Sequence, residues 1–346
     1  MPPMTLTVLT TRALNRALLA RQLLLERATL TLTEAVEQMG GLQTQYAPSG
    51  YVGLWTRLHD FRRDALTAAL EDRSVVQASL MRVTIHMVSR RDYWAFAVGV
   101  RQARRRWALR TPGATGGEED MIARADRLRA ALAHGPKSVA ELGALGAGFV
   151  GSLGLWVDLV RVPPSGTWER RRADRLGLAE DWVGYEDATE AQGLAHLVLT
   201  YLRAFGPAPW RDIASWAGIA VADARQGAQD MHIVRYRDEA GRELVDLPGA
   251  PLPDPDTPAP VRFLPHWDAV LLVHARRTAI LPEAYRPRVF SSRNPFSVGT
   301  VLVDGRVVAG WSLRDRRIAL DPFEVVSAAD VRAIDEERQR LEAFLA

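Results

Sequence analysis

Hydrophobic residues recur at helical spacing through the first part of the chain. The segment 33–42 carries an apolar stripe that predicts an amphipathic helix with Thr33 as its N-cap. Gly40 and Gly41 weaken its last turn and Pro48 prevents its continuation, so a loop is expected between them. Further helices are predicted over residues 12–27 and 63–71, with an apolar segment at 52–58.

The pattern then changes to the alternation that is typical of a strand. Residues 79–88 are rich in β-branched side chains and alternate between apolar and polar positions. Residues 74–80 precede them as another short element. Helices followed by a pair of strands indicate a winged helix, which is a fold that usually binds nucleic acid.

This order of elements recurs twice more along the chain. Gly-Pro pairs at residues 135–136 and 206–207 each join the end of one helix to the start of the next. After each pair we predict a third helix and two strands joined by a turn, over residues 159–171 and 232–247. The short helices that begin directly after the pairs are predicted at 138–142 and 210–217. The pattern therefore predicts three tandem winged-helix units.

A proline-rich segment, residues 247–260, follows as a stiff linker. Beyond it we predict a mostly β module with a hairpin turn at Asp304-Gly305, and a charged amphipathic helix over residues 328–345. The strands of this module are predicted at 261–264, 270–273, 298–303 and 306–313. The fold class is α+β, and the predicted domains are residues 1–115, 116–187, 188–250 and 251–346.

The chain contains no cysteine, which excludes disulfides, thiolate nucleophiles and cysteine-based metal sites. Its seven histidines do not have the spacing of a zinc site, so we expect neither a metal nor a cofactor. No stretch of eighteen apolar residues occurs, and residues 1–12 lack the basic and apolar parts of a secretion signal. We therefore expect a cytoplasmic protein without a membrane segment.

The basic residues are almost all arginine. Lys137 is the single lysine among the 44 Lys and Arg residues, and the formal net charge is +3. Codon usage in a GC-rich genome explains this composition, and so does phosphate binding, because a guanidinium contacts an anion through two N–H groups at once. A group of arginines beside Trp107 is predicted to lie on one helix, as a solvated face or as a surface for nucleic acid. These arginines are Arg101, Arg104, Arg105 and Arg106.

Two glutamines in the loop after the second helix are the candidate catalytic residues. Gln43 and Gln45 are two positions apart, so in extended backbone their side chains share one face and reach one small target. An amide supplies N–H donors and a carbonyl acceptor but does not titrate, so the pair can position a water or a sugar without acting as an acid or base. The alternative is that both are ordinary polar loop residues.

Several motifs together resemble the AlkZ and YcaQ winged-helix DNA glycosylases, which remove alkylated bases and unhook interstrand crosslinks. The resemblance covers nearly the whole chain and rests on segments 12–22, 41–45, 82–86, 263–265, 271–277 and 303–311. The family motif is Gln-x-Gln in AlkZ-like members and Gln-x-Asp in YcaQ-like members, and Gln43-Thr44-Gln45 has the AlkZ-like form. The middle residue is commonly apolar in the family, whereas here it is Thr44, whose β-branched side chain suits an extended, half-buried position.

The resemblance implies tandem winged helices in a C shape whose concave face holds duplex DNA. It also implies hydrolysis of the N-glycosidic bond of cationic N7-alkylpurines, and we expect the chain to act as a monomer. Gln45 would hold the attacking water, and Gln43 would position that water or the sugar. The residues that we expect at the DNA are Arg12, Asn15, Arg16, Arg82, Thr84, His86, His274 and Arg277. For the last five, ordinary hydrogen bonds within the protein are an equal alternative.

Two other classes of protein remain open. A transcriptional regulator and an architectural DNA-binding protein would also contain winged helices and arginines, because a fold does not fix a function. Dependence of activity on Gln43 and Gln45 separates an enzyme from both. No lysine lies near the two glutamines in the sequence, so a lyase step through a Schiff base is not expected.

Overall fold

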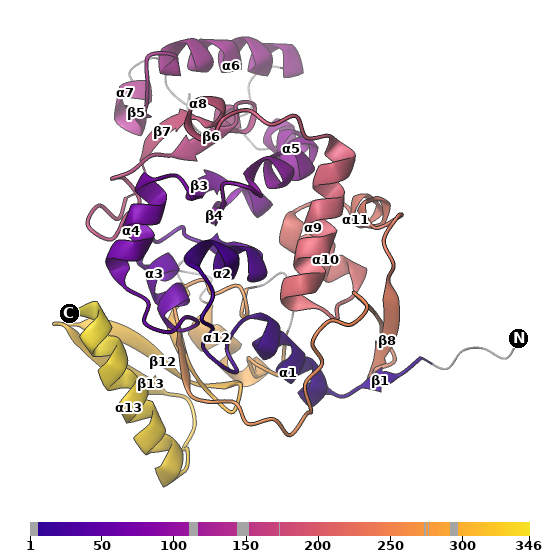
Figure 1. Cartoon of the computed structure of the whole chain (residues 1–346), viewed down its shortest axis with the longest axis vertical. Helices are drawn as coiled ribbons and strands as arrows, with labels where there is room; N and C mark the ends of the chain where they lie inside the picture. Colours follow the sequence, from indigo (N-terminus) through magenta and orange to yellow (C-terminus); the bar gives the residue numbers. More distant parts are fainter. Residues whose placement is uncertain are drawn as a thin grey trace, which may run out of the picture.

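The computed structural model describes residues 6–110, 117–143, 152–172, 174–272, 275, 277–290 and 297–346 of the chain. The helices of its first segment are α1 (Thr11–Arg21), α2 (Leu32–Gln38), α3 (Pro48–Trp55), α4 (Arg63–Glu71) and α5 (Tyr93–Arg110). Of these, α2, α3 and α4 pack against strands at one end of a sheet (Figure 1). Thr31 caps α2 through a capping box with Glu34, and Pro48 begins α3, where its missing N–H costs no hydrogen bond.

One six-stranded antiparallel sheet joins the first two predicted units. Its strand order is β2-β4-β3-β6-β7-β5. The strands are β2 (Leu42–Gln43), β3 (Val75–Ser79), β4 (Ile85–Ser89), β5 (Lys137–Ser138), β6 (Leu159–Arg161) and β7 (Arg175–Leu178). Because β3 pairs with both β4 and β6, the sheet continues across the predicted domain boundary at residues 115 and 116. The first two units are therefore not separate bodies.

The second and third segments each present helices beside a strand pair. The second contains α6 (Glu118–Leu132), α7 (Val139–Gly143), the 3-10 turn η2 (Ser152–Leu155) and α8 (Ala179–Val183). The third contains α9 (Glu190–Phe205), α10 (Trp210–Ala217), α11 (Val221–Gly227), β8 (Val234–Asp238) and β9 (Glu243–Asp246). The short N-terminal strand β1 (Val8–Leu9) pairs in parallel with β8 and completes a three-stranded sheet.

Helices α5 and α9 cross at a pair of glycines. A Cβ atom placed on Gly99 would lie 2.6 Å from the carbonyl oxygen of Gly193, so only glycine allows the two backbones to approach this closely. The crossing connects the first segment to the third and lies within the largest group of buried apolar residues.

The C-terminal module is a four-stranded antiparallel sheet covered by one helix. Its order is β10-β11-β12-β13, and the long helix α13 packs on it (Figure 1). The elements are β10 (Arg262–Leu264), η3 (Glu283–Tyr285), α12 (Arg286–Val289), β11 (Gly299–Val303), β12 (Arg306–Arg314), β13 (Arg317–Pro322) and α13 (Ala328–Leu345). The predicted hairpin turn at Asp304-Gly305 is confirmed, because it connects β11 to β12.

Several predicted elements were wrong in their limits. The helix expected over residues 12–27 ends at Arg21, and the helix expected over 33–42 begins at Leu32 with Thr31 rather than Thr33 as its N-cap. The strand expected over 79–88 is interrupted by a tight turn, η1 (Met81–Val83), so it forms the end of β3 and most of β4. The second hairpin returns at 175–178 rather than before 171, residues 270–272 form no strand, and β13 was not predicted.

Buried ion pairs hold the segments together. Arg21 of α1 forms two hydrogen bonds of 2.7 Å with Asp246 of β9, and Arg57 forms two of 2.9 Å with Asp268. Each pair is buried and joins residues more than two hundred positions apart. Removal of either partner would therefore leave the other charge buried and unpaired.

No helix in the described ranges is long and apolar enough to cross a membrane.

Candidate active site

The turn that carries the glutamines depends on two glycines. After α2 the chain reverses through Gly40 and Gly41, whose φ angles are 74° and 79°. A Cβ on Gly41 would also lie 3.0 Å from the carbonyl oxygen of Met87 in β4. This left-handed backbone and close approach let β2 pair with β4 directly after the turn, which places Gln43 opposite His86. The two glutamines thus lie at the edge of the six-stranded sheet.

Gln43 is half-buried and its amide is held by an arginine. Its carbonyl oxygen accepts a hydrogen bond of 3.0 Å from Nη2 of Arg82. A guanidinium can only donate hydrogen bonds, so the amide oxygen of Gln43, rather than its amide nitrogen, faces Arg82. Gln43 also lines a small hollow with Pro265, His266 and Trp267 of the C-terminal module.

Gln45 is exposed and its amide extends the strand pairing. The backbone N–H of Thr44 donates to the carbonyl oxygen of Ile85 at 2.8 Å, and the backbone N–H of Ile85 donates to Oε1 of Gln45 at 3.1 Å. The Thr44 side chain between the two glutamines is buried against Gly50. Both amides therefore contact the β3–β4 hairpin, Gln43 at its turn through Arg82 and Gln45 at the start of β4 through Ile85.

Each of the two amides keeps capacity for a further ligand. A carbonyl oxygen has two lone pairs, and one lone pair of each Oε1 is used by Arg82 or Ile85. Within the described ranges, neither Nε2 donates a hydrogen bond to the protein. The pair can thus offer acceptors and donors together to a water, a sugar or a phosphate. Neither amide can take up or release a proton, so the pair positions and polarises its ligand.

Arg82, Thr84 and His86 lie beside Gln43, and we call these four residues the Gln43 cluster. Arg82 sits at φ 52° in η1, and Nη1 donates to the carbonyl oxygen of Trp216 at the end of α10. Burial lowers the pKa of Arg82 to about 10. His86 is 3% exposed, and burial together with the charge of Arg82 lowers its pKa to about 3, so the ring is neutral at neutral pH.

The tautomer of His86 follows from its contacts. Nδ1 lies 3.0 Å from the carbonyl oxygen of Thr84, which can only accept, so Nδ1 carries the proton. Nε2 then has a lone pair that faces Nη2 of Arg82 at 3.4 Å. The hydroxyl of Thr84 donates to the carbonyl oxygen of Met81 at 3.1 Å and closes the turn. Thr84 and His86 thus support the turn from within the protein.

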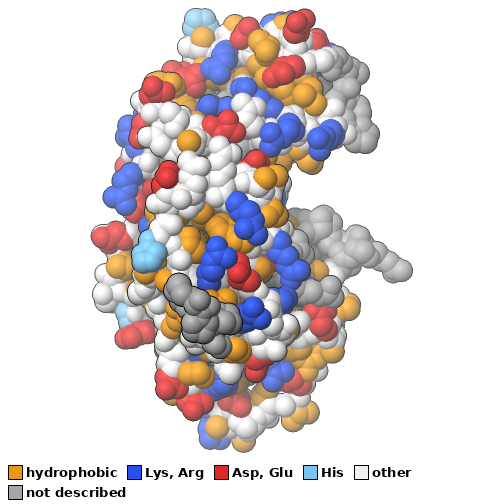
Figure 2. Space-filling view, turned by 90° about the vertical axis from the view of Figure 1, so that its right-hand side faces the viewer, with side chains coloured by type: hydrophobic (Ala, Val, Ile, Leu, Met, Phe, Trp, Pro, Cys, Tyr) orange, Lys and Arg blue, Asp and Glu red, His pale blue; other side chains and the backbone are white. Residues whose placement is uncertain are grey.

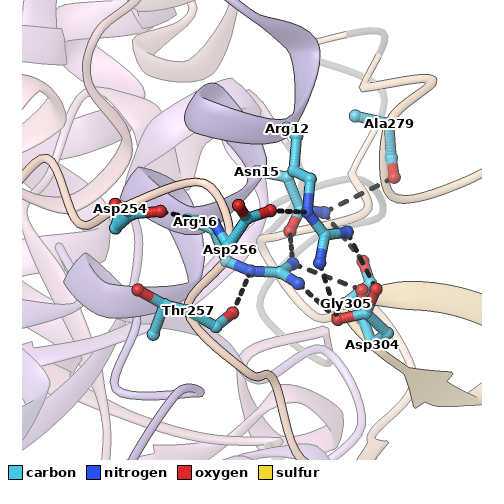
Figure 3. A network of polar contacts seen from close by, with 9 residues as sticks. All are labelled: Arg12, Asn15, Arg16, Asp254, Asp256, Thr257, Ala279, Asp304 and Gly305. Atoms are coloured by element: carbon cyan, nitrogen blue, oxygen red, sulfur yellow. Dashed lines mark hydrogen bonds and ion pairs between the residues drawn. The ribbon is translucent and has the colours of Figure 1, made fainter.

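The side chains of Arg12, Asn15 and Arg16 of α1 meet the turn between β11 and β12 in the C-terminal module (Figure 3). Together with Asp304 they form what we call the α1 clamp. Arg16 has no exposed side-chain surface: Nε donates to the carbonyl oxygen of Thr257 at 2.6 Å, and Nη2 pairs with the carboxylate of Asp304. Asn15 is also buried and donates to the carbonyl oxygen of Gly305 at 2.9 Å.

Arg12 is the exposed member of the α1 clamp. Its Nη1 lies 2.8 Å from Oδ2 of Asp304, and its Nε lies 3.9 Å from Asp256. A phosphate contact by Arg16 or Asn15 would require a buried side chain to leave its partners, whereas the side chain of Arg12 is 45% exposed and could release Asp304 in favour of a phosphate. Of the three α1 residues expected at the DNA, the structure therefore buries Asn15 and Arg16 and leaves Arg12 exposed.

The remaining predicted contacts are divided between several places. Arg277 is half-buried, with Nη1 donating to the carbonyl oxygen of Val270 at 3.1 Å and its guanidinium 5.3 Å above the Phe205 ring. His274 lies outside the described residues. Arg277 also donates to the hydroxyl of Tyr201 at 3.3 Å.

The arginines of α5 do not form one row. Arg104 is buried and pairs with Asp158, as does Arg101. Arg105 lies 5.8 Å from the ring of Trp156, and Arg106 pairs with Asp223 of α11 at 3.3 Å. Successive arginines on a helix point in different directions, so only part of this cluster reaches solvent.

Sequence reasoning missed the part of the site that comes from distant segments. His266 meets the Tyr46 ring edge-on at 5.6 Å, and it lies beside Gln43 in the small hollow. The motif 263–265, which was used for the resemblance, directly precedes it and was the available signal. Trp216 contributes only a backbone oxygen, and no sequence pattern marks such a contact.

Comparison with known proteins finds one matching family model and a similar solved structure. A family model described as DNA glycosylase AlkZ-like matches residues 36–344, which include both glutamines. The solved structure of the DNA glycosylase AlkZ from Streptomyces sahachiroi is similar with a TM-score of 0.80 and 18% identity, covering 96% of this chain and 95% of that chain. No curated protein matches the sequence. The family match spans most of the chain, and the chain therefore belongs to the AlkZ-like DNA glycosylase family.

Proposed function

We propose that the protein is a monofunctional DNA glycosylase that hydrolyses the N-glycosidic bond of cationic N7-alkylpurines, including those in interstrand crosslinks. The observation that carries this proposal is the placement of Gln43 and Gln45 at the edge of the six-stranded sheet, where Gln43 accepts a hydrogen bond from Arg82 and Gln45 accepts one from Ile85. Membership of the AlkZ-like DNA glycosylase family supports a base in DNA as the substrate.

The chemistry of a cationic base suits two amides. An N7-alkylated guanine departs as a neutral base, so it needs little help from a general acid, and the sugar develops positive charge. The site must place a water at the far face of the sugar and stabilise that charge. In our proposal the free lone pair of Gln45 Oε1 orients the water, and Gln43 positions that water or the sugar. A carbonyl dipole also favours the developing cation, more weakly than a carboxylate would.

The position of the single lysine supports hydrolysis without a lyase step. Lys137 lies on β5, whereas Gln43 lies on β2, and these strands form opposite edges of the six-stranded sheet. Five strand spacings of about 4.8 Å separate them by roughly 24 Å. This separation supports our proposal that Lys137 forms no Schiff base with a sugar held at Gln43.

We further propose that the three helix and strand-pair segments act as winged-helix units of a C-shaped monomer around duplex DNA. Figure 2 shows an indentation in the outline of the molecule with Lys and Arg side chains on the surface above it. The site is built within one chain, so no second copy is needed to complete it. A transcriptional regulator or an architectural protein would use the same surface without the glutamine pair.

The test is release of free N7-methylguanine from a duplex under single-turnover conditions, with alkaline cleavage to reveal abasic sites. We expect release above the spontaneous rate by the unmodified protein and its loss in Gln45→Ala. A duplex with an N7-linked interstrand crosslink tests the wider substrate in the same format. Binding of the duplex without release of any alkylated purine would favour the regulator or architectural alternatives.

A further inference from the structure

The turn between β3 and β4 contains a side chain that connects two distant parts of the molecule. Arg82 donates through Nη1 to the carbonyl oxygen of Trp216 and through Nη2 to Oε1 of Gln43 at 3.0 Å. Trp216 lies in the last turn of α10, where helix carbonyls have no partner within the helix and carry partial negative charge. The guanidinium of Arg82 therefore connects α10 of the third segment to Gln43 of the first segment.

The backbone of Arg82 is also held by α10. Gly218 ends that helix at φ 76°, and a Cβ placed on it would lie 3.0 Å from the backbone nitrogen of Arg82. Arg82 itself adopts φ 52°, which is unfavourable for a residue with a side chain. The end of α10 thus packs directly on the turn that aims the guanidinium.

His86 is the third group that contacts the guanidinium of Arg82. Its Nδ1 proton goes to Thr84, so its Nε2 lone pair faces Arg82 at 3.4 Å. In the strand register His86 stands opposite Gln43. Within the described ranges, the hydrogen-bond partners of Arg82 are all neutral groups, so no carboxylate competes with Gln43 for the guanidinium.

We propose that Arg82 is a positioning residue that fixes the Gln43 amide with its oxygen inward, and that α10 of the third segment sets this position. The proposal rests on the proposed function, because it assigns a role within that site. Lysine cannot replace the fork, since a single ammonium reaches two acceptors on opposite sides less well than a planar guanidinium. Gln43 would lose its fixed orientation in such a variant while the positive charge remained.

The first experiment compares rate and affinity in Arg82→Lys. We expect the single-turnover rate of N7-methylguanine release to fall by about tenfold to a hundredfold, while the Kd for the duplex changes by less than about threefold. In a Gln43→Ala background the same substitution should change the rate by less than about twofold, because its target is already removed. An undiminished effect in that background would overturn the proposal and indicate that Arg82 acts on DNA directly.

The second experiment perturbs the support of Arg82 without altering any polar side chain. Gly218→Ala introduces the Cβ that presses on the Arg82 backbone, and we expect a rate loss of about threefold to tenfold. Gly241→Ala is the matched control, because Gly241 has φ 75° and no atom lies within 4 Å of its added Cβ. Equal rate losses in the two variants would show that α10 does not set the site.

A third measurement does not depend on catalysis. Unfolding free energies of the wild type, Arg82→Lys, Gln43→Ala and the double variant form a cycle that reports the contact itself. We expect the double variant to be less destabilised than the sum of the single variants, and additive losses would overturn the contact. If the wild type releases no alkylated purine, the proposed function fails, and this cycle still decides whether Arg82 holds Gln43.

Discussion

The Gln43 cluster and the α1 clamp both contain arginines that the sequence assigned to DNA, yet the two regions use them differently. In the α1 clamp, Arg12 and Arg16 meet Asp304, and Arg12 also lies near Asp256, so two positive charges face two negative ones. In the Gln43 cluster, Arg82 donates to a backbone carbonyl and an amide and faces a neutral imidazole. Counted together with Asp256, the clamp has balanced charges, whereas the cluster keeps a net positive charge.

The difference shows that the partner of an arginine, rather than its position in a motif, decides its role. An arginine paired with a carboxylate joins two segments. The negative charge of its partner offsets most of its field, so the pair attracts an anionic ligand only weakly. Burial alone would raise the pKa of Asp304, but the hydrogen bond from Arg12 and the charges of both arginines lower it overall. An arginine held by neutral acceptors orients those acceptors and still contributes its field to the site.

The largest effect that we expect is a loss of catalytic rate. It should follow changes at Gln43 and Gln45 and not changes in the α1 clamp. Gln45→Ala and Gln43→Ala should each lower the single-turnover rate by about tenfold to a thousandfold, or about 1.4 to 4 kcal/mol, with duplex affinity nearly unchanged. The double variant should cost less than the sum, because both residues act on one water. Gln45→Asp should retain activity, because it keeps an oxygen near Ile85. Wild-type rates in both alanine variants would place the site elsewhere on the chain.

The next effect is one of stability and belongs to the α1 clamp. Arg16→Ala removes a side chain with no exposed surface and leaves the carbonyl oxygen of Thr257 without its donor, so it should cost about 2 to 3 kcal/mol in urea unfolding. The rate of base release by the folded variant should stay near that of the wild type. Arg12→Ala is the matched control and should leave the unfolding midpoint almost unchanged, because Arg12 is exposed. A large rate loss in Arg16→Ala with normal stability would contradict a purely structural clamp.

A smaller effect should appear in the pH dependence of stability. The pKa of buried His86 is lowered to about 3, whereas in the unfolded chain it is near 6.5, so only the unfolded state takes up this proton between those values. Stability is therefore fully present above pH 6.5 and should fall with decreasing pH by up to about 1.4 kcal/mol per unit for this group. Half-buried His196, whose pKa is lowered to about 4, adds to the same trend. His86→Gln should make the urea midpoint less sensitive to pH between 6.5 and 4.5, and an unchanged slope would mean that His86 titrates normally.

The smallest effect concerns salt and compares two arginines of α5. Affinity for duplex DNA should fall with increasing salt, because phosphate contacts release counterions. Arg106 is exposed, so Arg106→Ala should reduce the slope of log K against log salt by about 0.9 if it contacts one phosphate. Arg104 is buried against Asp158, and Arg104→Ala should leave the slope unchanged. Equal slopes in the wild type and both variants would exclude this face of α5 from the DNA surface.

Part of the fold could be predicted because local patterns sufficed. Helices α4, α10 and α13 were predicted with the limits that the structure shows, since each has a clear apolar stripe and polar ends. The turn at Asp304-Gly305 follows from its own residues, which accept positive φ angles. The end of the helix before Gln43 follows from the glycines at residues 40 and 41.

The turn at Arg82 could not be predicted for the opposite reason. Arg82 and Val83 both have positive φ angles, and β-branched valine is among the residues least suited to that conformation. Their local preference is for a strand, which is the element that the sequence predicts for residues 79–88. Packing against the end of α10 overrides the preference, and this contact joins residues more than one hundred positions apart.

The sequence by itself determined the family, the α+β composition and the pair of glutamines, because motifs and periodicity are properties of neighbouring residues. Only the tertiary structure decided that the first two units share one sheet, that Arg16 is enclosed by the C-terminal module and that Arg82 holds Gln43. A side chain's partner depends on which distant segments meet it. Burial and charge pairing, which assign the role of an arginine, therefore arise only when the chain has folded.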